Sequence, residues 1–170
     1  MGLFSFLKNA GAALIGGGKK ETTPTPAAPA APDAMQQLAN AQLAMRLTNQ
    51  VVGLGLKVEN LNIEVDDDKA TVYGTVDNQS EKEKVILAVG NVAGIATVDD
   101  RMSIMAAPDV APEPESTFYE VKKGDTLSKI AKEQYGSANK YMTIFNANKP
   151  MLSDPDKIYP GQMLRIPPMA

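Results

Sequence analysis

The chain of 170 residues contains no histidine, no cysteine and no tryptophan. Without histidine and cysteine it lacks the usual zinc ligands, the thiol nucleophile and the most common general base. A catalytic site would have to rest on carboxylates, lysine or tyrosine, and no constellation of that kind stands out. We therefore predict that the protein is not an enzyme.

Long apolar runs are also missing, since none approaches the roughly 20 residues that a transmembrane helix needs. The start, Met1 to Lys8, is a poor secretion signal because its apolar run comes first and Lys8 interrupts it. A myristoylation motif would need serine or threonine where the chain has Phe6. We expect a cytoplasmic protein with no transmembrane segment.

Charge is unevenly distributed. Residues 1–116 carry a net charge of −6 and residues 117–170 a net charge of +3. No basic cluster is dense enough to indicate nucleic-acid binding. The opposite charges favour attraction between the two parts of the chain, or an affinity of the first part for cations.

Proline is dense in two stretches, 17–33 and 106–116, which we interpret as linkers because closely spaced prolines prevent helix and sheet. The folded segments are then 34–105 and 117–168. The segment 1–16 has apolar residues at spacings of three and four, which predicts an amphipathic helix. That helix could dock on the protein's own domain, lie on a membrane surface or fray. We favour docking, because a single lysine on the polar face is a weak signal for membrane binding. The apolar residues are Leu3, Phe6, Leu7, Ala10 and Leu14.

The segment 34–105 has the pattern α-β-β-α-β. A helical repeat of leucine and valine comes first, followed by two alternating strands around the acidic turn 66–68. A capping box, Ser80 to Glu83, predicts the start of the second helix. Gly90 suits the left-handed backbone position that ends this helix. The last strand is expected at 95–104.

The segment 117–168 has the pattern strand, helix, helix, strand. It opens Phe118-Tyr119-Glu120-Val121-Lys122-Lys123-Gly124-Asp125-Thr126-Leu127-Ser128 and closes Ile158-Tyr159-Pro160-Gly161-Gln162-Met163-Leu164-Arg165-Ile166-Pro167. These residues resemble the LysM family. The middle segment, with Thr71-Val72-Tyr73-Gly74-Thr75-Val76 followed by Val89-Gly90-Asn91-Val92-Ala93-Gly94-Ile95-Ala96-Thr97-Val98, resembles a BON domain. The expected fold is α+β, an αββαβ domain and a βααβ domain.

The loop after Gly90 is the first candidate site. A helix end carries free carbonyls and a partial negative charge, and two glycines let successive carbonyls turn inward. A ring of neutral carbonyls suits a monovalent cation such as K⁺. A plain αβ turn with a glycine cap is the alternative from the residues alone.

The order of domains resembles the small bacterial potassium-binding proteins. That resemblance implies K⁺ held by the main-chain carbonyls of Gly90, Val92 and Ile95, joined by those of Leu7 and Ala10 if the N-terminal segment ends beside the loop. The rival cation sites are the acidic runs 66–68 and 99–100, which lack the pattern of a Ca²⁺ loop and which we interpret as solvated.

The LysM resemblance also implies a groove for N-acetylglucosamine glycans, although the same residues build the fold in any case. One wall would be Gly124, Asp125, Thr126 and Leu127, and the other Lys149, Pro150, Met151, Leu152, Ile158 and Tyr159. We thus expect a cytoplasmic K⁺ sensor or buffer whose LysM domain docks in the ion-bound state. The alternative is an envelope protein that binds peptidoglycan glycans, with the BON domain contacting lipid or a partner.

Overall fold

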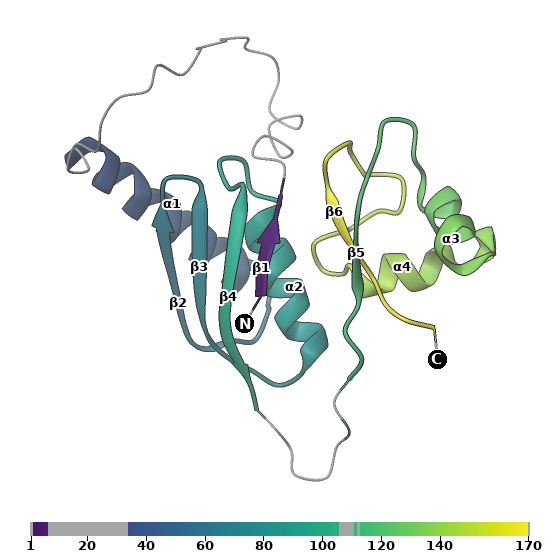
Figure 1. Cartoon of the computed structure of the whole chain (residues 1–170), viewed down its shortest axis with the longest axis horizontal. Coiled ribbons are helices and arrows are strands. Elements are labelled where there is room, and N and C mark those ends of the chain that lie inside the picture. Colours follow the sequence, from purple (N-terminus) through teal and green to yellow (C-terminus); the bar gives the residue numbers. More distant parts are fainter. Residues whose placement is uncertain (1, 7–33, 106–110, 112, 170) are drawn as a thin grey trace.

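The computed structural model describes residues 2–6, 34–105, 111 and 113–169, which form two domains lying side by side (Figure 1). The first domain is one sheet in the order β1-β4-β3-β2 with two helices packed on one face. Its elements are β1 Gly2–Ser5, α1 Ala34–Gly53, β2 Glu59–Asp66, β3 Lys69–Val76, α2 Gln79–Gly90 and β4 Thr97–Ile104. The predicted αββαβ order is confirmed, with one strand added at the N-terminus.

The sheet follows from alternating sequence. Val72 and Val76 of β3 and Val98 of β4 are almost fully buried against the helices. β2 and β3 form an antiparallel hairpin, whereas β3 and β4 are parallel with α2 as the crossover. Asp67, with φ of +54°, makes the hairpin turn, as aspartate tolerates the left-handed region.

The N-terminal residues differ from the prediction. Gly2–Ser5 form β1, an edge strand antiparallel to β4, so the helix expected over 1–16 is wrong for these residues. Leu3 is 67% exposed while Phe6 is buried and Phe4 packs against the core, which is a strand alternation. The free edge of β4 offers backbone partners that an isolated helix start does not have. Residues 7–16 lie outside the described part of the chain.

The caps of helix α2 also differ from those predicted from the sequence. Glu81 N donates to Asn78 Oδ1 at 2.8 Å, so Asn78 is the N-cap and the predicted capping box at Ser80 is wrong. Gly90 is still helical and Asn91, with φ of −80°, is the C-cap, so Gly90 is not the left-handed residue. Strand β4 begins at Thr97, two residues later than expected, because Ile95 belongs to a turn.

Gly90 has a different structural role. A Cβ placed on it would lie 2.2 Å from Cζ of the Phe6 ring. Only glycine lets that ring lie directly on the last turn of α2.

The second domain has the predicted βααβ order. Its elements are β5 Thr117–Glu120, α3 Leu127–Tyr135, the 3₁₀ turn η2 Ala138–Lys140, α4 Tyr141–Ala147 and β6 Met163–Ile166. Thr126 caps α3, accepting a hydrogen bond from Lys129 N at 3.2 Å, and Gly136 ends that helix with φ of +71°. Threonine at an N-cap and glycine at a left-handed C-terminal position are residue types that these positions favour.

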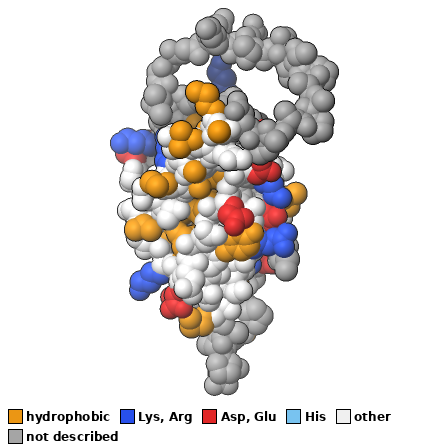
Figure 2. Space-filling view, turned by 90° about the vertical axis from the view of Figure 1, so that its left-hand side faces the viewer, with side chains coloured by type: hydrophobic (Ala, Val, Ile, Leu, Met, Phe, Trp, Pro, Cys, Tyr) orange, Lys and Arg blue, Asp and Glu red, His pale blue; other side chains and the backbone are white. Residues whose placement is uncertain are grey.

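The side of the molecule formed by α1 and β2 exposes scattered apolar side chains (Figure 2). On α1 these are Met35, Leu38, Met45 and Val52. None of the helices in the described ranges is both long and apolar enough to cross a membrane.

Candidate functional site

The site begins with the α2–β4 loop, residues 91–96, which follows the C-terminus of α2. Ile95 N donates to Val92 O at 3.2 Å, and Gly94 has φ of +105°, so a tight turn closes directly after the helix. Val92 N donates to Val89 O at 3.3 Å. Within the described ranges, the turn and loop hydrogen bonds do not use the carbonyls of Gly90 and Ile95.

The N-terminal strand brings a second segment to this loop. Phe6 N donates to Ala96 O at 2.7 Å, and the Phe6 ring lies on Gly90. Phe6 is the last described residue of this segment, and it lies beside the loop. Of the residues predicted to bind through their carbonyls, Gly90 is the last residue of α2, and Val92 and Ile95 lie in the loop directly after it, while Leu7 and Ala10 lie outside the described residues.

Asp66 and Asp67 are exposed, as expected for a solvated turn, whereas Asp99 and Asp100 are engaged within the protein. Asp100, expected to be solvated, is only 3% exposed; it pairs with Lys82 at 2.9 Å and accepts a hydrogen bond from Met102 N. That prediction was wrong because Lys82 on α2 neutralises the carboxylate under the sheet. Asp99 faces outward, where Arg101 and Lys69 lower its pKa. Among the residues described there is no group of three or more acidic side chains that could hold a metal ion.

Asn91, the C-cap of α2, also joins the two domains. Its Nδ2 donates to Met163 O at 3.0 Å, and Met163 N donates to its Oδ1 at 2.9 Å. One side chain therefore satisfies both backbone groups of a residue on the strand β6. The α2–β4 loop and the position of the second domain are coupled through this residue.

A buried ion pair forms the other main contact between the domains. Arg165 Nε of β6 donates to Glu83 Oε2 of α2, and both side chains are less than a tenth exposed. Gln79 Nε2 and Ser116 N donate to Glu83 Oε1, each at 2.9 Å. The rings of Phe4 and Phe118 meet edge to face with centroids 5.2 Å apart. The sequence pattern did not mark Glu83 as a contact residue, because this glutamate fitted the end of a capping box. The opposite charges of the two domains were the signal in the sequence that pointed to docking.

The protonation of Glu83 should control this contact. Burial acts to raise the pKa of Glu83, but hydrogen bonds from Arg165, Gln79 and Ser116 outweigh it and hold the pKa below its usual value of 4.5. A depressed carboxylate pKa contributes stability that is present above the unfolded-state value and lost as pH falls through the folded-state value.

We therefore expect the melting temperature to fall more steeply below pH 4.5 in the natural protein than in Glu83→Gln. Thermal melts of both proteins from neutral pH to pH 3 measure the difference, and the other carboxylates contribute equally to each curve. Parallel curves for the two proteins would contradict the role given to Glu83.

The residues predicted to form the glycan groove have different structural roles. Leu127 and Leu152 are buried in the core of the second domain, and Thr126 is used as a helix cap. Asp125 accepts hydrogen bonds from Tyr119 Oη and Lys122 N and pairs with Lys129. Gly124, Lys149 and Pro150 are exposed, and Ile158 packs against the core of the second domain.

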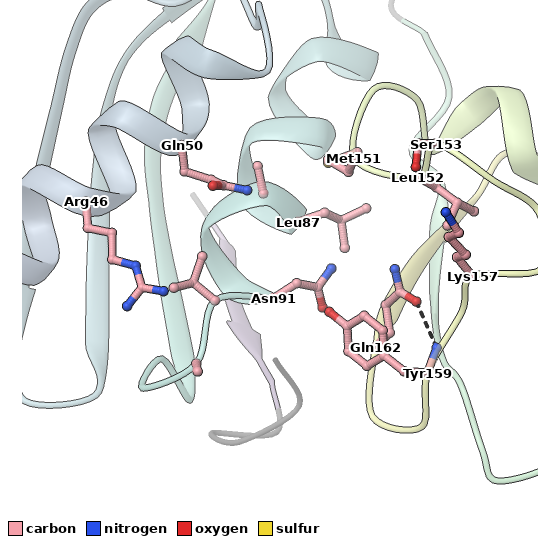
Figure 3. A pocket seen from close by; sticks show the side chains of 13 residues that line it. Arg46, Gln50, Leu87, Asn91, Met151, Leu152, Ser153, Lys157, Tyr159 and Gln162 are labelled. Carbon is pink, nitrogen blue, oxygen red and sulfur yellow. Dashed lines mark hydrogen bonds between the residues drawn. The ribbon is translucent and has the colours of Figure 1, made fainter. Parts of the chain in front are cut away.

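The remaining groove residues turn toward the first domain. Met151 packs against the core of the first domain, and Met151, Leu152 and Tyr159 line a cavity between the two domains (Figure 3). Burial raises the pKa of Tyr159. One wall of the predicted groove is therefore part of the domain interface.

Comparison with known proteins agrees with this architecture. The BON domain model matches residues 39–106 and the LysM domain model matches residues 119–167. The fold thus defines a two-domain BON–LysM protein, and neither matched model describes a catalytic domain.

Two relatives are similar over much of the chain. "Potassium binding protein Kbp" of Escherichia coli O6:H1 is 55% identical over 109 residues, 64% of this chain and 70% of that protein. An uncharacterized protein of Deinococcus radiodurans is 32% identical over 150 residues, 80% of this chain and 58% of that protein. The chain belongs to the BON–LysM family of which Kbp is a member.

Proposed function

We propose that this chain is a cytoplasmic potassium-binding protein, acting as a K⁺ sensor or buffer rather than as an enzyme. The ion binds to main-chain carbonyls of Gly90, Val92 and Ile95, and the segment after β1 adds those of Leu7 and Ala10. The observation that carries the proposal is the convergence of the helix end, the turn and the N-terminal chain at one place, through Phe6 N and Ala96 O at 2.7 Å. The name of the 55% identical relative supports the choice of ion.

The chemistry of the loop favours a monovalent cation. The C-terminus of α2 presents carbonyls with a partial negative charge, and the loop itself, residues 91–96, contains no carboxylate. Divalent cations prefer carboxylate oxygens, whereas a ring of neutral carbonyls replaces the weakly held hydration shell of K⁺.

Ion binding would favour the docked arrangement through Asn91. An ion that orders the α2–β4 loop also fixes this side chain, whose amide holds both backbone groups of Met163. The docked population then rises with ion concentration, because the ion has higher affinity for the ordered loop.

Thermal melts in matched KCl, NaCl and choline chloride test the proposal. We expect the midpoint to rise selectively in KCl, since a ligand present at 100 times its dissociation constant stabilises the folded state by about 2.7 kcal/mol. The choline arm controls for ionic strength, because choline is too large for a carbonyl ring. Identical curves in the three salts would reject K⁺ binding.

Glycan binding through the LysM domain is the second candidate, supported by the family match to residues 119–167. It ranks lower because Met151 and Tyr159 lie at the domain interface and Leu127 and Leu152 lie in the core. In the docked arrangement Met151 and Tyr159 face the first domain, which leaves less of that wall open to a glycan.

A further inference from the structure

The cavity between the domains, which we call the interdomain cavity, is a second candidate site. Its volume is about 400 Å³, within the range of small-molecule pockets. The first domain contributes residues of α1, α2 and the α2–β4 loop, and the second contributes the segment 151–162 (Figure 3). Leu87, Met151 and the ring of Tyr159 supply apolar surface.

The charged residues that line the cavity are all positive. Arg46 on α1 and Lys157 in the second domain line the cavity, and none of its lining residues is aspartate or glutamate. This stands out in a chain with a net charge of −3. Within the described residues neither cation has an ion-pair partner. In Figure 3 the two side chains lie on opposite sides of the cavity.

Gln162 provides a further polar contact. It is 6% exposed, and its Oε1 accepts a hydrogen bond from Tyr159 N at 3.2 Å. Figure 3 shows its amide nitrogen directed into the space between the domains. Gln50 and Ser153 also line the cavity and can donate hydrogen bonds. Gln50, Ser153 and Gln162 can donate as well as accept, and both charged groups of the lining are cations, a combination that suits an acidic ligand.

We propose that the interdomain cavity binds a small organic dianion, with one acidic group at Arg46 and the other at Lys157 and Gln162. Charge-assisted hydrogen bonds hold the two ends, and the apolar wall contacts the portion between them. Because the two cations belong to different domains, the ligand bridges them and stabilises the docked arrangement. Phosphomonoesters and dicarboxylates share this chemistry.

The cation proposal is compatible with this site but is not required for it. Asn91, Val92 and Ala93 form part of the cavity wall, so a dianion and K⁺ would both stabilise the same loop. Arg46 and Lys157 disfavour a cation inside the cavity itself.

An NMR titration of the full chain at constant KCl and constant ionic strength tests the proposal. The probes are succinate as dicarboxylate, adenosine 5′-monophosphate as phosphomonoester, and acetate as monoanion. We expect saturable amide shifts at Asn91, Ser153 and Gln162 with one or both dianions, and the responding arm identifies the acid. Arg46→Gln and Lys157→Gln should each weaken binding about tenfold, the size of one charge-assisted hydrogen bond.

Lys132→Gln is the matched control, because Lys132 is exposed on α3 and does not line the cavity. This variant should keep the affinity of the natural protein. The proposal is overturned if neither dianion gives saturable shifts, if acetate binds as tightly, or if the double variant Arg46→Gln/Lys157→Gln responds unchanged. Since KCl is constant in every sample, a failure of K⁺ binding does not alter this outcome.

Discussion

Arg165→Met is expected to lower the free energy of unfolding by about 3–5 kcal/mol, because it leaves the carboxylate of Glu83 buried without its cation. Glu83 is 1% exposed and Arg165 is 7% exposed, so water does not replace the lost partner in the docked arrangement. Methionine keeps much of the volume and the apolar contact of the arginine stem. Denaturant unfolding measures the loss.

The domains have one way to relieve this penalty. If they separate, Glu83 regains water, and the loss is limited to the free energy of docking. Small-angle X-ray scattering distinguishes the two outcomes, because separation increases the radius of gyration while each domain keeps its secondary structure.

A double variant and a surface variant control the result. Glu83→Gln/Arg165→Met removes both charges and should recover much of the stability lost in Arg165→Met. Lys132→Met, at an exposed position of α3, should change stability by less than about 0.5 kcal/mol. A loss in Arg165→Met no larger than that of Lys132→Met would show that the buried pair does not hold the domains together.

Gly90→Val should abolish the K⁺ stabilisation that the proposed function predicts, and it should lower the free energy of unfolding by about 1–3 kcal/mol through overpacking. Its Cβ would meet the Phe6 ring at 2.2 Å, so the ring and strand β1 must move. That movement removes the N-terminal chain from the α2–β4 loop, where Phe6 N now donates to Ala96 O. The second domain, which has its own core, should keep its structure.

Gly53→Val is the matched control. Gly53 is the last residue of α1, and a Cβ placed on it meets nothing within 4 Å. Thermal melts in KCl and choline chloride compare both variants with the natural protein. If Gly90→Val keeps a K⁺-selective rise in midpoint, the ion does not bind at this loop.

Short segments show where sequence patterns are ambiguous. In Gly2–Ser5 and Phe6, the spacing from Leu3 to Phe6 suits a helix, while the spacing from Phe4 to Phe6 suits a strand. So few residues cannot stabilise a helix alone. The unpaired edge of β4 decided between the two, and that edge exists only after the sheet has formed.

Buried charged residues are the second feature that the sequence patterns did not predict. Glu83 and Asp100 are typical surface residues in sequence, and both are buried because a distant cation neutralises each. The partner of Glu83 lies 82 positions away on another domain. No local pattern records such a pair, because it depends on how α2 and β6 approach each other.

The amino-acid sequence by itself determined both secondary-structure patterns, αββαβ and βααβ, and several local caps such as Thr126 and Gly136. These depend on periodicity, capping and turn chemistry, which act between near neighbours along the chain. Only the tertiary structure decided that Phe6 covers Gly90, that Asn91 holds Met163, and that two cations face one cavity. Such contacts join residues far apart in sequence, and the packing of whole elements brings them together.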